Sequence, residues 1–293
     1  MNQYPLVTVT CVRDLPLFEL QAQSMSLYAP DNADIIIIVN EQDPTEWNDY
    51  FNTHIRHYYS RHNLTVKYLS DFLLDIQSSD GWDIQQTLKI VIGRRGINAD
   101  RYLVLDSQNF LIKPLYYLQH PVKDGLVPFR TGEFVMPWTI WRNYARALEL
   151  ESFHPPEDAM SMCTPLWFKT DLIKSLIREH GNEYGFSKWF NEVSKIKSEF
   201  MLYYLWGEKQ GGFRKHHYRI GDWAGPYLRD GIDFDKDVEK FLLEAGASIF
   251  IPFTSINFRA WGEMGEAQYT QVCEKLQQFG LTPNFEEFRK TYS

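Results

Sequence analysis

The turn Asp106-Ser107-Gln108-Asn109 contains the residue types best suited to chemistry in this sequence. It follows the apolar run 102–105 directly, so it lies where a buried strand would end. The carboxylate of Asp106 can bind a hard cation that also contacts phosphate oxygens, whereas the amide of Gln108 offers an oxygen without charge. The competing interpretation is an ordinary turn after a strand, where aspartate is common.

Basic side chains offer a second way to stabilise negative charge on a leaving group. The candidates are Lys89, Arg13 and the cluster Arg214-Lys215-His216-His217. Because Gln108 lacks the charge that would strengthen a cation site, two interpretations stay open. Either the turn binds a metal weakly, or basic side chains take over the role of the metal.

Glu199 is the first candidate for a catalytic carboxylate, because a carboxylate can take the proton from an attacking hydroxyl group as a general base. The structural alternative is a helix start, with Ser198 as the N-cap and Glu199 favoured by the helix dipole. Glu157 and Asp158, which follow two prolines, form a second pair of carboxylates. For that pair the alternative is an exposed turn.

Alternating strands and helices in the first hundred residues would position these side chains. Short apolar runs predict strands at 6–10, 35–39, 64–69 and 102–105. Apolar spacing predicts helices after Asp14, over 45–59 and after Asp80. This alternation is typical of a mainly parallel sheet with right-handed crossovers.

Ligands bind beyond the carboxyl ends of the strands in such sheets. Thr10, Arg13 and Asp14 follow the first predicted strand, and Asp106 follows the fourth. We therefore expect these residues to line one cleft.

The second half of the chain is less regular. Strands are predicted at 126–129 and 248–253, helices at 170–179 and 199–208, and a last helix at 266–279 that ends before Gly280. The sequence contains no repeat and no obvious linker, which predicts a single domain over residues 1–293.

Composition excludes several classes of protein. A net charge of −8 over 293 residues argues against a general nucleic-acid binder, and three distant cysteines do not predict a disulfide framework. No apolar run approaches the ~20 residues of a transmembrane segment, and the first residues do not resemble a signal peptide, so we expect a soluble cytoplasmic protein. The phosphate-loop, dinucleotide-binding and α/β-hydrolase motifs are absent from the sequence.

Several motifs, in this order and spacing, resemble those of GT-A glycosyltransferases. The helical motif 85–89 (Gln-Gln-Thr-Leu-Lys) precedes a strand and Asp106, where these enzymes carry a D-x-D motif, with Gln108 in place of the second acid. Segments 164–168 (Thr-Pro-Leu-Trp-Phe), 171–173 (Asp-Leu-Ile) and 198–203 (Ser-Glu-Phe-Met-Leu-Tyr) resemble a poorly characterised bacterial group with an S-E-Y-x-L-Y-like motif. The resemblance covers residues 5–205.

The resemblance implies a GT-A-like, Rossmann-like α/β fold with a mixed, mainly parallel sheet flanked by helices and a more irregular C-terminal half. Residues 1–115 would form the nucleotide-binding half, and residues 116–293 the acceptor-side half. The implied activity is transfer of a sugar from a nucleotide-sugar donor to a glycan-type acceptor, as in bacterial glycan synthesis.

The resemblance also implies roles for individual residues. Glu199 would face the acceptor. The donor would be bound by Thr10, Arg13, Asp14, Lys89, Asp106 and Gln108. A Mn²⁺ or Mg²⁺ ion would be bound weakly by Asp106, with Gln108, His216 or His217 as further ligands.

Two other functions remain open. A nucleotidyltransferase can use the same sheet, although the glycine-rich basic loop expected after its first strand is missing. A non-catalytic descendant that binds a nucleotide sugar is the other alternative, and the lost acid at Gln108 favours it.

Overall fold

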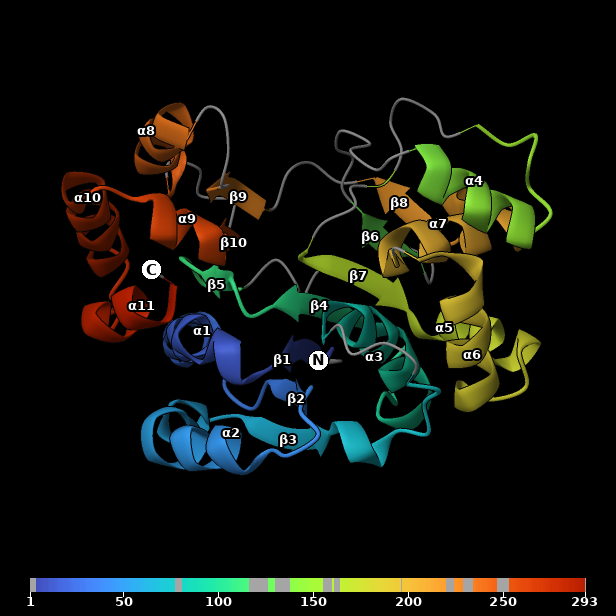
Figure 1. The fold of residues 1–293 in the computed structure, drawn as a ribbon, viewed down its shortest axis with the longest axis horizontal. Helices are drawn as coiled ribbons and strands as arrows, with labels where there is room; N and C mark the ends of the chain where they lie inside the picture. Colours follow the sequence, from blue (N-terminus) through green and yellow to red (C-terminus); the bar gives the residue numbers. More distant parts are fainter. Residues whose placement is uncertain are drawn as a thin grey trace.

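A computed structural model describes residues 4–76, 81–115, 126–129, 138–154, 160, 164–195, 197–219, 224–228, 234–246 and 253–292. At its centre lies a five-stranded sheet with the strand order β3-β2-β1-β4-β7 (Figure 1). The strands are β1 (Leu6–Thr10), β2 (Asp34–Val39), β3 (Asn63–Tyr68), β4 (Arg101–Asp106) and β7 (Leu166–Lys169). The first four are parallel and β7 pairs antiparallel with β4, which confirms the predicted mixed, mainly parallel sheet.

Helices cover both faces of this sheet (Figure 1). Alternate residues of β2 pack into two hydrophobic clusters, Ile35 and Ile37 on one face and Ile36 and Ile38 on the other. The first face is covered by α1 (Leu15–Tyr28), α2 (Thr45–Tyr50), a π-helical turn (Phe51–Ile55) and a 3-10 turn (Arg56–Tyr59). The second cluster contains side chains of α3 (Gly81–Arg95), α4 (Trp138–Ala147), α5 (Thr170–Glu179), α6 (Glu183–Val193) and α7 (Glu199–Lys209). Strands buried on both faces explain the continuous apolar run at 35–39.

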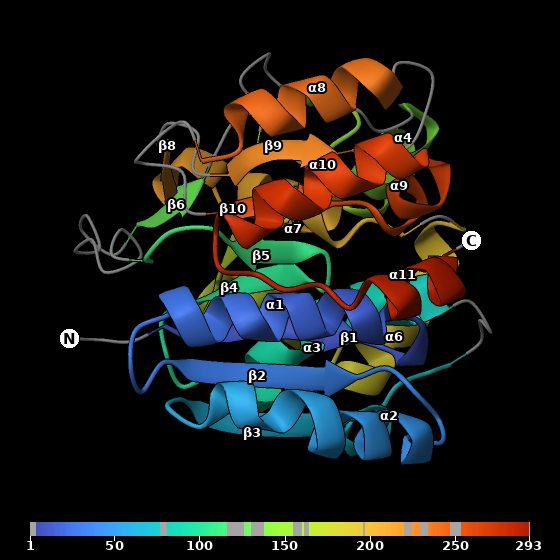
Figure 2. The same cartoon turned by 90° about the vertical axis from the view of Figure 1, so that its left-hand side faces the viewer.

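The C-terminal part of the chain packs around a third hydrophobic cluster. A small sheet with the order β5-β10-β9 leads away from the end of β4. Its strands are β5 (Asn109–Leu111), β9 (Ala224–Leu228) and β10 (Phe253–Ile256), and its helices are α8 (Phe234–Glu244), α9 (Phe258–Glu263), α10 (Glu266–Gln277) and α11 (Phe285–Tyr292). Figure 2 shows α11 beside α1, and Leu17 and Leu20 of α1 belong to this cluster.

Two predictions for this region differ from the structure. The helix over 266–279 is not the last one, because α11 follows the turn at Gly280. Most of the strand predicted at 248–253 lies outside the described residues, and β10 begins where that prediction ends. In the part of the chain that the structure describes, no helix is long and apolar enough to cross a bilayer.

Strands β6 (Val127–Phe129) and β8 (His217–Arg219) form a separate parallel pair. His217 is 2% exposed and its ring stacks on Phe213 at a centroid distance of 3.8 Å. Its Nδ1 lies 3.1 Å from the carbonyl oxygen of Phe213, and its Nε2 lies 2.7 Å from the hydroxyl of Tyr203. This fits a neutral ring that donates through Nδ1 and accepts through Nε2. Burial lowers the pKa of His217 to about 3.

We expect this histidine to make folding stability depend on pH. In unfolded chains its pKa returns to about 6.5, so between about pH 6.5 and pH 3 the unfolded state binds one more proton. The free energy of unfolding should therefore fall as the pH falls below 6.5, by up to about 1.4 kcal/mol per pH unit from this residue. Urea unfolding at pH 7 and pH 5 measures this change. Between these two values the free energy of unfolding should fall less in His217→Gln than in wild type. The exposed His57→Gln serves as control, and equal slopes for wild type and His217→Gln would contradict the prediction.

Candidate functional site

A buried ion cluster lies at the carboxyl end of β4. The Nζ of Lys89, on α3, lies 2.7 Å from Oδ1 of Asp106 and 2.9 Å from Oε1 of Glu199, the first residue of α7. The side chains of Lys89 and Glu199 are 3% and 2% exposed, whereas that of Asp106 is 24% exposed. Asp106 is therefore the member of the cluster that a ligand can reach.

The cluster keeps Lys89 charged. Burial disfavours its ammonium group, but the charges of Asp106 and Glu199 outweigh burial and raise the pKa of Lys89. Two carboxylates and one ammonium leave an excess negative charge, which reaches solvent at Asp106. Through these contacts Lys89 supports the acidic turn.

Hydrogen bonds fix the shape of the acidic turn. The hydroxyl of Thr164 donates to Oδ2 of Asp106 at 2.6 Å, and the Asp106 N–H donates to Oδ1 of Asn109 at 2.7 Å. The amide of Gln21, 1% exposed on α1, donates to the carbonyl oxygens of Asp106 and Asn109, both at 2.7 Å. Thr8 of β1 in turn donates to Oε1 of Gln21 at 2.8 Å. The turn is thus attached to α1 and β1.

The ends of β1 and β2 meet beside this turn, as parallel strands require. In the register Val9 lies opposite Asp106, and the N–H of Asn40 donates to the carbonyl oxygen of Thr10 at 2.8 Å. Oγ1 of Thr10 and Oδ1 of Asn40 are buried and have no hydrogen-bond partner among the described residues. Such groups are rare in folded proteins, so both atoms are suited to contact a ligand at this edge of the sheet.

The turn after β1 brings Asp14 to the same place. Its Oδ2 lies 3.4 Å from the hydroxyl of Ser107, next to Asp106 in the chain, and burial raises its pKa. Asp14 occupies the predicted N-cap position of α1, but its side chain makes no capping hydrogen bond. The side chain of Arg13 is 63% exposed, with Nε 3.9 Å from Oδ1 of Asp14. The structure thus brings together Thr10, Asp14 and Asp106, as the strand order predicted.

Glu199 was interpreted either as a catalytic carboxylate or as part of a helix start, and the structure bears on both. Ser198 is the N-cap of α7 and accepts a hydrogen bond from the N–H of Met201, so the helix start is confirmed. The carboxylate of Glu199 contacts Lys89 and is almost fully buried. A general base must contact the acceptor hydroxyl, so these contacts favour a role that acts through Lys89. The general-base role stays a prediction.

The remaining candidates differ in what the structure shows of them. Both ring nitrogens of His217 are engaged in the β6–β8 region, and Nε2 of His216 lies 3.4 Å from the carbonyl oxygen of Gln210. These contacts favour a core residue at His217 over a metal ligand. Glu157 and Asp158 lie outside the described residues. Gln108 follows Asp106 in the turn, and its backbone carbonyl accepts a hydrogen bond from Ile256 of β10.

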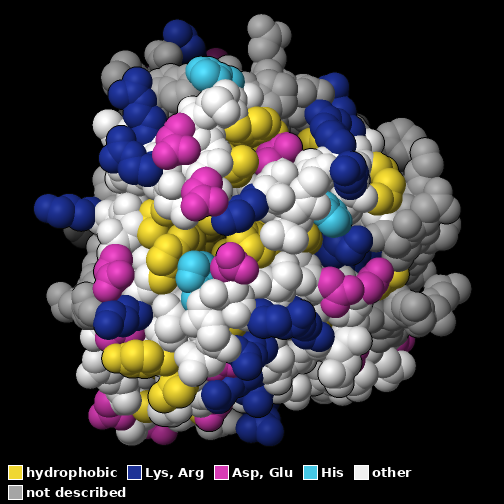
Figure 3. Space-filling view, turned by 90° about the vertical axis from the view of Figure 1, so that its right-hand side faces the viewer, with side chains coloured by type: hydrophobic (Ala, Val, Ile, Leu, Met, Phe, Trp, Pro, Cys, Tyr) yellow, Lys and Arg dark blue, Asp and Glu magenta, His cyan; other side chains and the backbone are white. Residues whose placement is uncertain are grey.

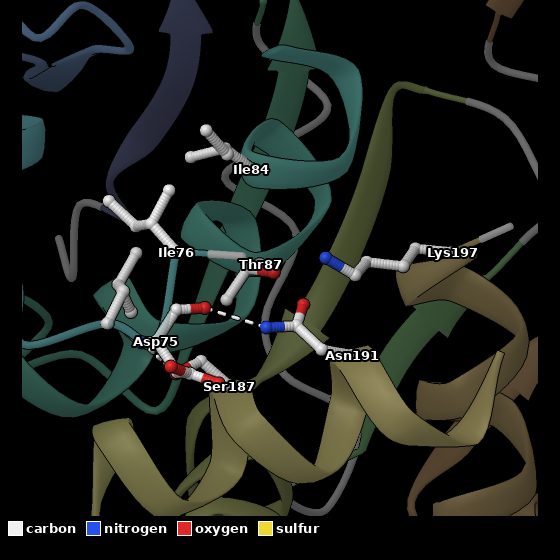
Figure 4. A pocket seen from close by; sticks show the side chains of 8 residues that line it. Asp75, Ile76, Ile84, Thr87, Ser187, Asn191 and Lys197 are labelled. Carbon is white, nitrogen blue, oxygen red and sulfur yellow. Dashed lines mark hydrogen bonds between the residues drawn. The ribbon is translucent and has the colours of Figure 1, made fainter. Parts of the chain in front are cut away.

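Two cavities lie among the described residues. One, of about 10 Å³, lies beside α3 and α6, where Lys197 points towards Thr87 and Asn191 (Figure 4). It has room for a single water at most. The other, of about 270 Å³, is lined by Phe51, Arg56 and Tyr68 among others and lies against the edge strand β3. Since β3 is three strands from β4, roughly 14 Å across the sheet, this second cavity lies away from the acidic turn. The first cavity is lined by Thr87 and Lys197, but not by Lys89, Asp106 or Glu199.

The face shown in Figure 3 carries basic and acidic side chains interspersed with small apolar areas. The absence of nucleic-acid binding, expected from the net charge, stays a prediction.

Sequence reasoning missed three residues of the site. Gln21 lies inside a helix and carried no motif, so its bonds to the turn had no sequence signal. Asn40 follows β2 as directly as Asp106 follows β4, and that parallel could have indicated it. Thr164 was part of a recognised motif, but its contact with Asp106 joins residues 58 positions apart.

Solved structures with a similar fold are glycosyltransferases. The WbbM bifunctional glycosyltransferase in its apo form has a TM-score of 0.57 and 15% identity over 99% of this chain and 51% of its own, so this chain spans about half its length. The galactosyltransferase LgtC with donor and acceptor sugar analogues has a TM-score of 0.55 and 10% identity over 98% and 99% of the two chains. Apo GlyE of Streptococcus pneumoniae TIGR4 has a TM-score of 0.53 and 11% identity over 99% and 62%. The chain therefore has the GT-A fold of these proteins, and at such identities the likeness shows the fold alone.

At the level of sequence, no curated protein matches the chain. One family does match, described as a family of unknown function (DUF6492), over residues 9–280. The match extends beyond residue 205, where the resemblance predicted from motifs ended. The bacterial group expected from the S-E-Y-x-L-Y-like motif stays a prediction. Because the match covers most of its length, the chain belongs to the DUF6492 family.

Proposed function

We propose that this protein is a glycosyltransferase that moves a sugar from a nucleotide-sugar donor to a glycan-type acceptor. The observation that carries the proposal is the partly exposed carboxylate of Asp106, positioned by Lys89 and Thr164 at the carboxyl end of β4. Ligands of parallel α/β sheets bind at this edge. The GT-A fold supports the same reading, as an analogy at the level of fold. A cytoplasmic location and a place in bacterial glycan synthesis remain part of the proposal.

The donor would lie across the ends of β1, β2 and β4. Carboxylate oxygens accept hydrogen bonds from hydroxyl groups, so Asp106 would bind a hydroxyl of the ribose or of the transferred sugar. The buried Oγ1 of Thr10 and Oδ1 of Asn40 would gain partners in the same ligand. Arg13, whose side chain reaches solvent beside Asp14, would contact the diphosphate.

In the reaction a hydroxyl oxygen of the acceptor attacks the anomeric carbon of the donor sugar. The new bond joins these two atoms, the bond from the anomeric carbon to the diphosphate breaks, and the nucleoside diphosphate leaves with the electron pair. The hydroxyl proton passes to a base. We propose that Glu199 acts by holding Lys89 in place, because its carboxylate contacts Lys89 and is 2% exposed.

Replacing Asp106 should weaken donor binding. Asp106→Asn keeps the size of the side chain but removes the charge, and we expect donor affinity to fall at least about tenfold, which corresponds to about 1.4 kcal/mol. Thermal shift with UDP-, GDP-, CMP- and dTDP-sugars measures this, since a ligand at about 100 times its Kd adds about 2.7 kcal/mol of stability. The exposed Asp49→Asn is the matched control.

A wild-type protein that binds none of these donors would overturn the proposed function. So would an Asp106→Asn variant that binds the donor and releases nucleotide at the wild-type rate. Donor binding without hydrolysis or transfer, in the presence of candidate acceptors, would instead favour the non-catalytic alternative.

Glu199→Gln separates a positioning role from general-base catalysis. If Glu199 acts through Lys89, the variant should lose less than about tenfold in kcat and keep the shape of its pH profile. A general base contributes about 10² to 10⁴-fold and determines the acidic limb of the profile. Nucleotide release from the donor identified by thermal shift gives kcat across pH 5 to 9. A loss of about 10³-fold together with a lost acidic limb would contradict the positioning role and restore the predicted base.

A further inference from the structure

The GT-A fold implies a divalent cation at the acidic turn, so the contacts there test whether such an ion fits. Both carboxylate oxygens of Asp106 are engaged, Oδ1 with the Lys89 ammonium at 2.7 Å and Oδ2 with the Thr164 hydroxyl at 2.6 Å. A metal on Oδ1 would lie beside the Lys89 ammonium, and a metal on Oδ2 would share that oxygen with the Thr164 hydroxyl. The hydroxyl can turn away, but the ammonium is 3% exposed and is also bonded to Glu199 at 2.9 Å.

The cluster carries an excess negative charge, but its ammonium opposes a cation placed directly beside it. A metal on Asp106 would lie close to the Lys89 ammonium, and two positive charges repel strongly in a buried site. The neutral Gln108 occupies the position of the second acid, so no carboxylate there offsets this repulsion. Lys89 also makes a cation–π contact with Phe200, whose ring centroid lies 5.3 Å from Nζ.

Asp14 is a further acid near the turn, but the histidine predicted as a metal ligand has other partners. Both ring nitrogens of His217 have partners in the structure. Within the described residues, no group of three or more His, Cys, Asp and Glu side chains could hold a metal ion. The residues at the acidic turn therefore do not fit a resident divalent cation.

We propose that the ammonium of Lys89 takes the place of a divalent cation at this turn, so that the donor diphosphate is bound without a metal. The second half of this inference rests on the proposed function. Lys89 offsets the charge of Asp106, which would otherwise repel the diphosphate. In this proposal the buried carboxylate of Glu199 holds the ammonium in the position that a metal would occupy.

Binding of Mn²⁺ to the protein without nucleotide tests the first half directly. Free Mn²⁺ gives an electron paramagnetic resonance signal that decreases on binding. Wild type should leave this signal unchanged at millimolar Mn²⁺. Gln108→Asp restores the second acid but keeps the ammonium, and should also leave it unchanged. The triple variant Lys89→Met/Gln108→Asp/Glu199→Gln has the same two acids without the ammonium, and should bind Mn²⁺ at least tenfold more tightly than Gln108→Asp alone.

Stoichiometric Mn²⁺ binding by wild type that Asp106→Asn abolishes would overturn the proposal. The proposal also fails if Gln108→Asp binds Mn²⁺ as tightly as the triple variant, because the ammonium would then not be the occupant. Near-ultraviolet circular dichroism confirms that each variant is folded. The proposal holds if the Mn²⁺ signal distinguishes the triple variant from the other two proteins.

The second half is tested with the donor found by thermal shift. Its stabilisation of wild type should differ less than twofold in apparent Kd between EDTA and Mn²⁺. An affinity that requires Mn²⁺ would overturn metal-free binding. If no sugar nucleotide stabilises the protein under either condition, the proposed function fails, whereas the Mn²⁺ titration still decides whether Lys89 fills the cation position.

Discussion

The contact between Lys89 and its two carboxylates is the interaction on which the site depends. It joins α3, the end of β4 and the start of α7, and two of its three members are almost fully removed from water. A buried charge is tolerated only when it is paired, so none of the three elements can move away without leaving an uncompensated charge. The cost of breaking the cluster, several kcal/mol for a buried pair, keeps Asp106 in one position. The rest of the site is arranged around that fixed carboxylate.

The sheet explains why the other polar groups gather at the same edge. The strands β1, β2 and β4 are parallel neighbours, so Thr10, Asn40 and Asp106 meet where the strands end. Helix α3 reaches this edge from one face and α1 from the other, one with Lys89 and one with Gln21. Each face thus contributes a polar side chain to the turn. The hydrophobic clusters on the two faces hold both helices against the sheet.

Local sequence patterns predicted those features of the fold that depend on residues close together in the chain. The parallel strands β1 to β4 and the helices α5 and α7 follow from periodicity and turn residues, as did the position of Asp106 after a strand. The bond between Lys89 and Glu199 joins residues 110 positions apart, and no local rule gives such a pairing. The antiparallel strand β7 was read as part of a motif and not as a strand, because a run of four residues carries little periodicity. Glu199 was recognised as important, but its burial depends on packing that only the fold determines.

The hydrogen bond from Asn109 to Ser255 links the acidic turn to the far end of the chain. Asn109 shapes the turn by accepting from the Asp106 N–H, and its own amide donates to the Ser255 hydroxyl of β10 at 2.6 Å. All residues proposed to bind the donor lie before residue 115, which suggests a separable module. The geometry of the acidic turn nevertheless depends on β10, the last of the described strands in the sequence. A nascent chain with only its first half synthesised would contain every residue proposed to bind the donor, but it would lack the strand whose Ser255 completes the acidic turn.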